Sequence, residues 1–393
     1  MRVLHVYRTY FPDPPGGLQE AIRQIALACQ AEGVQSEIFA LSPAPQPTRL
    51  ERPEGRVIRS RSWAAPASCD LGGPLALRRF AKAAAAADVL QVHFPWPFAD
   101  LLLALARPRA PVIVTYQSDI VRQRLLGRLY APLMRRTLRR ATAVVATSPA
   151  YAASSPVLQQ PWLQDKLRVI PLGIVEASYA TTRQAAAAID PKARFAAAFA
   201  TLGAGTHDSY FLALGVLRYY KGLSTLVEAA ALSRQPVLIA GDGPERAALE
   251  RLAHRLGAPV AFTGRVSDAE KLALLRQCLA LVLPSHLRSE AFGMVLVEAA
   301  MLGRPLVSCE IGTGTSYVNR HEETGLVVPP ADAKALAGAL GTLAADPARA
   351  AHYGRQARAR FEALFSGRAL GRAYAGLYED VARDAAGRGP IGE

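Results

Sequence analysis

Two cations stand three residues apart where an apolar strand pattern gives way to a helical one. Arg218 and Lys221 follow the run 211–216, and the helical pattern begins directly after them. The N-terminal end of a helix carries partial positive charge, so cations there are unfavourable unless an anion lies between them and the helix. A diphosphate is the natural candidate for that anion. The simpler alternative is two solvated charges.

Two glutamates, Glu290 and Glu298, bracket an apolar run after the apolar strand 281–283. One precedes the predicted helix and the other lies inside it. Glu298 has apolar neighbours on both sides, and an unpaired carboxylate in such a place is costly, so a cation or a hydroxyl-rich ligand must satisfy it. The alternative interpretation is a helix-capping acid followed by a solvated glutamate.

A glycine pair, Gly16 and Gly17, follows the first predicted strand and leads into a helix. Glycines let the backbone approach a ligand closely because they lack a Cβ, although a Gly-Gly turn that merely starts a helix is more common. No G-x-G-x-x-G follows this strand and no acid lies at the usual distance. The pattern therefore argues against a dinucleotide-binding oxidoreductase.

The elements that position these residues alternate between strand and helix almost from end to end, which predicts parallel sheets covered by helices on both faces. The 393 residues fit two such doubly wound, Rossmann-like α/β domains. We expect domains at 1–175 and 209–366, a linker at 176–208, and a C-terminal helix over 367–393 that joins the first domain. The predicted strands are 3–7, 35–41, 89–93, 112–116, 143–146 and 167–170 in the first domain and 211–216, 237–240, 260–262, 280–283 and 305–308 in the second. The predicted helices of the first domain are 17–31, 74–87, 97–106 and 121–139.

The formal charge of +14 is concentrated in the first half of the chain. Residues 1–175 contain 22 Lys/Arg and 11 Asp/Glu, which leaves a net +11 there and +3 in the rest. The segment 120–164 has no acid at all. Within 121–140, arginines alternate with an apolar stripe, a pattern typical of a helix facing an anionic membrane and also of a core-packed helix with a solvated arginine face. Aromatic residues are not interleaved with the arginines, so we do not expect a nucleic-acid partner.

The cysteines and acids of the sequence predict neither a metal site nor disulfides. The four cysteines lie far apart, without metal-ligand spacing, and no D-x-D occurs. We therefore expect no metal and no cofactor, with protein cations balancing any diphosphate. Because no secretory signal and no long apolar span are visible, we expect a cytoplasmic protein whose membrane contact is peripheral.

Several of these motifs together resemble a known family. The Arg218/Lys221 pair and the Glu290/Glu298 pair match the R-x2-K-G type and E-x7-E motifs of retaining GT-B glycosyltransferases, which include glycogen synthases and bacterial mannosyltransferases. The segments 93–102, 115–123, 217–223, 283–293 and 310–317 resemble O-antigen and A-band polysaccharide mannosyl- or rhamnosyltransferases. The resemblance covers nearly the whole chain and implies two domains that face each other across a cleft.

The resemblance also implies a role for each matching residue in binding a nucleotide sugar. Arg218 and Lys221 would hold the donor diphosphate and stabilise the charge that develops as it leaves. Glu290 would contact donor sugar hydroxyls, and Glu298 would bind the nucleotide ribose. Phe292 and Gly293 would present backbone N–H groups, and Gly16 and Gly17 would let the loop of the first domain close over the diphosphate. The family's base-binding segment corresponds to Gly264, Arg265 and Val266.

One position departs from the family. Gln117 stands where the family usually has a histidine that touches the donor sugar. Glutamine keeps a hydrogen-bond donor and an acceptor but cannot become cationic. Activity survives if the residue only forms hydrogen bonds; otherwise the chain is slowed or has altered donor choice.

The narrower resemblance implies GDP-mannose or GDP-D-rhamnose as donor and a lipid-linked saccharide of bacterial surface polysaccharide as acceptor, at the inner face of the cytoplasmic membrane. Two alternatives remain open. The chain is a catalytically impaired binding or scaffold subunit of a glycan-assembly complex, or it uses a UDP-sugar and another acceptor.

Overall fold

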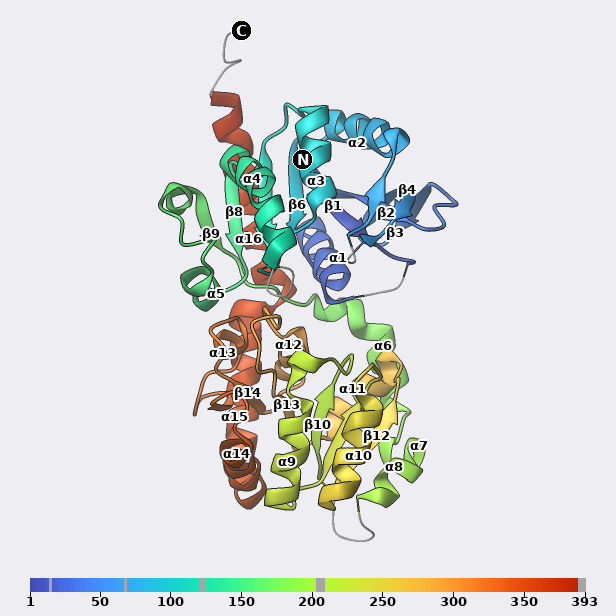
Figure 1. The fold of residues 1–393 in the computed structure, drawn as a ribbon, viewed down its shortest axis with the longest axis vertical. Helices are drawn as coiled ribbons and strands as arrows, with labels where there is room; N and C mark the ends of the chain where they lie inside the picture. Colours follow the sequence, from blue (N-terminus) through green and yellow to red (C-terminus); the bar gives the residue numbers. More distant parts are fainter. Residues whose placement is uncertain (14–15, 67–68, 120–123, 203–208, 388–393) are drawn as a thin grey trace. The chain divides into compact units, whose positions relative to one another are not determined.

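The computed structural model describes residues 1–13, 16–66, 69–119, 124–202 and 209–387, without the side chains of 124–129. The chain forms two compact units (Figure 1). Unit 1 contains Met1–Val175 and Gly367–Glu393, and unit 2 contains Glu176–Ser366. Each unit is built around its own sheet, so each is an α/β structure with its own core.

Unit 1 contains a sheet of nine described strands whose central members run parallel. Its order is β3-β4-β2-β1-β6-β7-β8-β9, and β5 pairs with β4. The centre, β1, is buried along most of its length because it lies between β2 and β6. The strands are β1 (Arg2–Thr9), β2 (Gln35–Ser42), β3 (Arg49–Arg52), β4 (Gly55–Ala64), β5 (Leu71–Gly72), β6 (Val89–Phe94), β7 (Val112–Tyr116), β8 (Ala143–Ala146) and β9 (Leu167–Val169).

Two rows of helices cover the sheet of unit 1. On one face α1 packs beside α16, and Gly371 permits this approach because a Cβ there would lie 2.4 Å from the Ala28 carbonyl oxygen. On the other face α2, α3 and α4 lie in sequence (Figure 1). The helices of unit 1 are α1 (Gly17–Gln30), α2 (Pro74–Ala86), α3 (Pro97–Ala106), α4 (Arg124–Arg140), α5 (Pro149–Ser154), η2 (Pro161–Lys166) and α16 (Gly367–Gly387).

Unit 2 contains a six-stranded sheet in the order β12-β11-β10-β13-β14-β15 in its described part. All its pairs are parallel, and every strand is largely buried. Strands covered on both faces are continuous apolar runs, and the sequence predicted all of these strands except β15 (Gly325–Val328). The strands are β10 (Phe211–Leu214), β11 (Val237–Ala240), β12 (Val260–Gly264), β13 (Ala280–Leu283), β14 (Leu306–Cys309) and β15 (Gly325–Val328).

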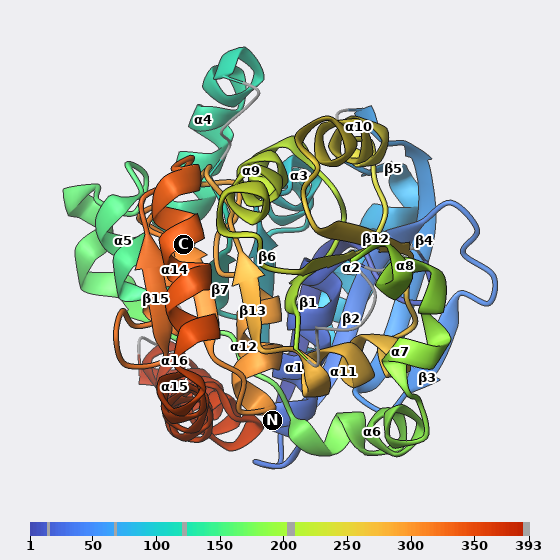
Figure 2. The ribbon, with the colours of Figure 1, turned by 90° about the horizontal axis from the view of Figure 1, so that it is seen from below.

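Helices also cover both faces of the second sheet. On one face α9 lies side by side with α14 and α10 (Figure 2), and together they enclose an apolar core that includes Phe211, Val237 and Leu340. On the other face α11 packs on β10, and α12 packs on β13 and β14. These helices are η4 (Tyr219–Lys221), α9 (Leu223–Ser233), α10 (Arg246–Leu256), α11 (Asp268–Gln277), α12 (Met294–Met301), α13 (Thr315–Val318), α14 (Ala333–Ala345), α15 (Pro347–Arg360) and the π-helical η5 (Phe361–Phe365).

The segment 176–208, which the sequence indicated as a linker, instead begins unit 2 with four short helices. They are η3 (Glu176–Tyr179), α6 (Ala180–Ala187), α7 (Pro191–Arg194) and α8 (Ala196–Thr201). Helices α6 and α7 pack on α11, and α8 packs on β12. Alanine is a strong helix former but gives little hydrophobic periodicity, which explains the error. Residues 203–208 lie outside the described chain.

Candidate functional site

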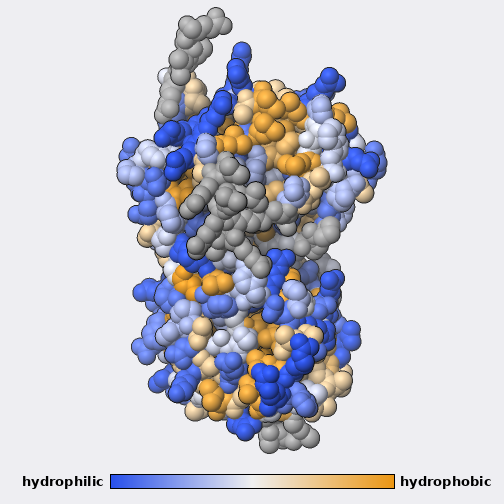
Figure 3. Space-filling model, in the orientation of Figure 1, coloured by the Kyte–Doolittle hydropathy of each residue, from blue (hydrophilic) through white to orange (hydrophobic). Residues whose placement is uncertain are grey.

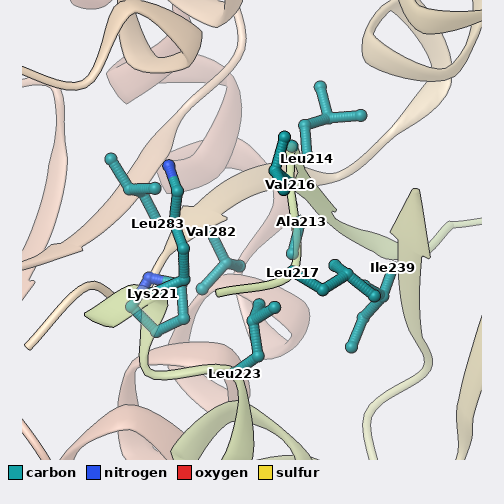
Figure 4. A pocket seen from close by; sticks show the side chains of 11 residues that line it. Ala213, Leu214, Val216, Leu217, Lys221, Leu223, Ile239, Val282 and Leu283 are labelled. Carbon is teal, nitrogen blue, oxygen red and sulfur yellow. The ribbon is translucent and has the colours of Figure 1, made fainter. Parts of the chain in front are cut away.

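Two loops of unit 2 meet at the carboxyl ends of the neighbouring strands β10 and β13. The His286 amide donates to the Tyr220 carbonyl oxygen (3.1 Å). Gly222 has a φ of +65°, and a Cβ there would lie 2.0 Å from the Pro284 carbonyl oxygen. This contact requires a glycine at 222 and fixes the loop that carries the two predicted cations. Lys221, Val216 and Leu283 line a pocket beneath these loops (Figure 4).

Lys221 and Glu290 form an ion pair in this place. Lys221 Nζ lies 2.5 Å from Glu290 Oε2, and the two side chains are only 14% and 13% exposed. Burial lowers the pKa of Lys221, but the Glu290 carboxylate raises it by more, so the net pKa lies above its ordinary value. The ammonium group therefore stays positive, as a partner of an anionic ligand must.

Arg218 lies on the same loop and is exposed. Burial raises the pKa of Tyr220 and Glu290 raises that of Lys221, and the nearby Arg218 charge offsets only part of each increase. Of the predicted pair, Lys221 is thus held by Glu290, whereas Arg218 on the same loop faces solvent.

The loop that carries Glu290 is held by groups to which the sequence analysis assigned no role, although they lie in the segments 283–293 and 310–317. Ser285 Oγ donates to Glu290 Oε2 (3.3 Å), and Thr313 Oγ1 donates to the Glu290 carbonyl oxygen (2.8 Å). The Gly314 amide donates to the Ala291 carbonyl oxygen (2.8 Å). Only the fold brings 313–314 to 290–291, so the sequence carried no local signal for these contacts.

Phe292 and Gly293 lead from Glu290 into α12. Phe292 is buried and packs edge-on against Phe365, with ring centroids 6.1 Å apart. Gly293 is the N-cap of α12 and has a φ of +82°, a conformation that favours glycine. Their backbone amides therefore lie at the start of a helix at the same edge of the sheet as Lys221. Their predicted contact with a donor sugar stays a prediction.

Glu298 lies within α12 and is satisfied by a cation from α11. Lys271 Nζ donates to Glu298 Oε1 (2.7 Å), and the Tyr179 hydroxyl donates to the same oxygen (3.3 Å). Burial lowers the pKa of Lys271, but Glu298 and Asp268 together raise it above its ordinary value. The structure thus places Glu298 in a different set of contacts from Glu290. A cation satisfies this carboxylate, as its apolar flanks required, and its predicted ribose contact stays a prediction.

Gly264, Arg265 and Val266 lie at the carboxyl end of β12 on the same sheet. Gly264 has a φ of +73°, and a Cβ there would lie 3.0 Å from Arg246 Nη1. The Arg265 side chain is 89% exposed, with its Nε 3.9 Å from Asp242 Oδ2. These residues therefore share the sheet edge with the Lys221 loop, on the far side of β11.

In unit 1, Gly16 and Gly17 form the exposed start of α1. Gly16 is extended, and a Cβ at Gly17 would meet nothing within 4 Å. The segment just before them is anchored by Asp13, which accepts hydrogen bonds from buried Arg59 (3.3 Å) and from Ser42 (3.1 Å). The Arg59–Asp13 pair was not predicted. This ion pair holds the backbone in place at Asp13, shortly before Gly16 and Gly17.

Gln117 follows β7 and is buried. Its Nε2 lies 3.1 Å from Nδ1 of His93, a fully buried residue at the end of the neighbouring strand β6. Its backbone amide donates to the Phe94 carbonyl oxygen (3.1 Å). Gln117 is therefore held by side chain and backbone at the carboxyl edge of the first sheet, where ligands of doubly wound sheets bind.

The predicted basic segment 121–140 lies partly outside the described residues, since nothing is described of the side chains of 121–129. In its described part the apolar positions Met134 and Leu138 are buried, and α4 packs on α3. The arginines of this part are exposed: Arg135, Arg136, Arg139 and Arg140. This half therefore has the arrangement of a core-packed helix with a solvated arginine face.

Two features are absent from the described residues. No group of three or more His, Cys, Asp or Glu side chains that could hold a metal ion occurs among them. No helix of the described chain has the length and apolar character needed to cross a membrane. The face shown in Figure 3 mixes hydrophilic and hydrophobic residues on each unit.

Models of two protein families match the chain. The family described as glycosyl transferases group 1 matches residues 195–360, and the glycosyl transferase 4-like domain matches residues 16–173. The first match contains all the predicted site residues of unit 2. The second contains Gly16, Gly17 and Gln117.

Individual proteins match over nearly the full length. The chain is 41% identical to O-antigen chain mannosyltransferase C of Escherichia coli, over 96% of this chain and 98% of that protein. It is 42% identical to a D-rhamnosyltransferase of Pseudomonas aeruginosa, over 93% of this chain and 92% of that protein. Among solved structures, sucrose-phosphate synthase of Thermosynechococcus elongatus matches with a TM-score of 0.75 at 26% identity, covering 98% of this chain and 99% of that one.

Proposed function

The chain belongs to the group 1 glycosyltransferases of the GT-B fold, and we propose that it transfers mannose or D-rhamnose from a GDP-sugar to a lipid-linked saccharide. The product would be part of a bacterial O-antigen. The observation that carries this proposal is identity above 40% to a mannosyltransferase and a rhamnosyltransferase over nearly the whole chain. A UDP-sugar donor with another acceptor is the alternative within the same family.

The site of unit 2 supports a charge-stabilising role for protein cations. Lys221 and Arg218 would bind the donor diphosphate and stabilise its growing negative charge as the bond to the sugar breaks. Glu290, 2.5 Å from Lys221, would accept hydrogen bonds from sugar hydroxyls while keeping the lysine in place. We further propose a retaining, metal-independent reaction in which the departing diphosphate helps to take the acceptor proton.

The acceptor side of the proposal concerns unit 1. A lipid-linked acceptor lies in a membrane surface, and the exposed arginines 135, 136, 139 and 140 would attract an anionic lipid headgroup layer. The protein would then work as a peripheral protein at the inner face of the cytoplasmic membrane. Arg140 donates to the Leu103 carbonyl oxygen of α3 (3.1 Å), whereas Arg135, Arg136 and Arg139 are exposed and would meet the headgroups.

A direct assay tests the reaction and its independence of metal. Purified protein, GDP-mannose or GDP-D-rhamnose and an undecaprenyl-diphosphate saccharide are expected to release GDP, and excess EDTA is expected to leave the rate unchanged. Parallel reactions with UDP-hexoses test the alternative donor. No turnover with any GDP-hexose would contradict the proposed donor class. Loss of turnover in EDTA that returns with Mg²⁺ would contradict the metal-independent mechanism.

Glu298 provides a test of the proposed ribose contact. Glu298→Gln keeps the shape of the side chain but removes its charge, and a hydrogen bond to a charged acceptor contributes about 1.5–3 kcal/mol. We expect the KM for the donor to rise at least about tenfold while kcat changes little. Steady-state rates with varied donor measure this.

Lys271→Met is the matched control for Glu298→Gln, because it breaks the same buried ion pair but keeps the carboxylate. Both variants are expected to melt at a lower temperature. Only Glu298→Gln is expected to raise the KM for the donor. Equal KM values in the two variants and the wild type would show that Glu298 has a structural role alone.

Gln117 favours a second candidate, an impaired binding or scaffold subunit. In that case the wild type would bind a GDP-sugar but release almost no GDP. Gln117→His would then raise turnover strongly from near zero. A wild type that is already active, with turnover unchanged or lowered in Gln117→His, would exclude this candidate.

A further inference from the structure

Four polar side chains form a hydrogen-bonded chain across four adjacent strands of unit 1. Ser36 on β2, His5 on β1, His93 on β6 and Gln117 just after β7 lie in that spatial order. Ser36 Oγ is 3.3 Å from His5 Nε2, His5 Nδ1 is 3.2 Å from His93 Nε2, and His93 Nδ1 is 3.1 Å from Gln117 Nε2. Both imidazoles are fully buried, and their rings stack with centroids 5.5 Å apart.

Burial keeps both rings neutral. It lowers the pKa of His5 to about 3, and burial together with neighbouring His5 lowers the pKa of His93 well below its ordinary value. A neutral imidazole has one donor and one acceptor nitrogen, so the hydrogen bonds must all run in one direction. Because Gln117 presents its Nε2 amide to His93, it donates to Nδ1 of that ring. Nε2–H of His93 then donates to His5 Nδ1, and Nε2–H of His5 donates to Ser36 Oγ.

The direction of this chain decides what Gln117 offers to a ligand. The oxygen and nitrogen of a carboxamide are two separate substituents of its trigonal carbon, so when the nitrogen donates to His93 the oxygen Oε1 is directed elsewhere and can accept another hydrogen bond. We propose that His5 and His93, as neutral Nε2–H tautomers, are positioning residues that make Gln117 a hydrogen-bond acceptor toward a hydroxyl of the donor sugar. The choice of a sugar hydroxyl as the bound group rests on the proposed function, whereas the direction of the chain does not.

Ring-nitrogen NMR of the full-length protein labelled with ¹⁵N-histidine tests the direction. Signals of His5 and His93 are assigned among the seven histidines by single substitutions. We expect both rings to be protonated at Nε2 alone at pH 7. Gln117→Glu replaces the amide donor with an acceptor, so both rings are expected to switch to the Nδ1–H tautomer. Protonation at Nδ1 in the wild type, or no switch in Gln117→Glu, would overturn the inference.

Activity tests the positioning role. His93→Leu removes the acceptor for Gln117 and is expected to lower kcat about tenfold, the equivalent of one hydrogen bond. His93→Gln offers an amide oxygen in its place and is expected to retain most of the activity. If the contact between His93 and Gln117 only supported folding, kcat would fall in each variant in proportion to the fall in its melting temperature.

Gln91→Leu is the matched control because Gln91 is a buried amide two residues earlier on the same strand. Its side chain donates to Thr115 Oγ1 (2.7 Å) and accepts from the Tyr378 hydroxyl. This variant is expected to lose stability and keep its kcat. If kcat in His93→Leu is no lower than in Gln91→Leu, the positioning role is overturned, but the direction of the hydrogen-bonded chain is not. A wild type inactive with every GDP-hexose overturns the proposed function, and the NMR result still decides the direction of the chain.

Discussion

Lys221→Ala is expected to lower kcat for sugar transfer by about 10²–10³-fold, or about 2.7–4 kcal/mol, the loss typical of removing one donor to a developing negative charge. Lys221 is the less exposed of the two cations, and the Glu290 carboxylate raises its pKa. A charge held in place before the reaction would stabilise the proposed leaving diphosphate without reorganisation. Donor turnover under saturating acceptor, with thermal melting to show that the variant is folded, measures the effect.

Three companion variants separate this effect from others. Lys221→Met keeps the aliphatic stem and is expected to lose as much activity as Lys221→Ala. Arg218→Ala removes an exposed cation and is expected to lose less, because solvent screens exposed charges. Lys334→Ala removes an exposed lysine of α14 and is expected to leave kcat unchanged. Unchanged turnover in Lys221→Ala would show that the cation pair is wrongly assigned.

Arg59→Met is expected to lower the free energy of unfolding of unit 1 by about 3–5 kcal/mol, because it leaves one partner of a buried ion pair without its counter-charge. Arg59 is 3% exposed, and its Nη2 contacts Asp13 Oδ1 (3.3 Å), Ser42 Oγ (2.8 Å) and the Ala44 carbonyl oxygen (2.7 Å). All three tryptophans, at 63, 96 and 162, belong to unit 1, so their fluorescence in a urea titration follows this unit.

Two controls sharpen this prediction. Arg61→Met removes an exposed arginine two residues along the same strand and is expected to change the free energy of unfolding by less than about 0.5 kcal/mol. Arg59→Met combined with Asp13→Leu removes both charges and is expected to recover part of the loss, because no buried charge is then left unpaired. If Arg59→Met alone were as stable as the wild type, the Arg59–Asp13 ion pair would not anchor the segment before Gly16.

The sequence predicted most strands and helices because their apolar runs are local signals. The predicted strands 112–116, 143–146, 237–240 and 280–283 have the same bounds as β7, β8, β11 and β13. Strands β3, β4, β5 and β15 were missed. Strand β4 reads Gly-Arg-Val-Ile-Arg-Ser-Arg-Ser-Trp-Ala, which contains no continuous apolar run. Its neighbours β3 and β5 have only four and two residues, too few to show a hydrophobic pattern. The alanine-rich segment 176–208 was predicted to be a linker because its described helices are short and weakly amphipathic, so they too give no clear pattern.

By itself the sequence determined the two parallel-sheet domains, the glycosyltransferase family and the positions of the cations and acids, since each depends on residue order and spacing along the chain. The tertiary structure alone decided which charges meet. Lys221 pairs with Glu290 across 69 positions, Glu298 pairs with Lys271 rather than joining them, and His5, His93 and Gln117 connect three strands. Ion pairs and hydrogen bonds act over a few ångströms in space, and only the folding of parallel strands into one sheet brings such distant residues that close.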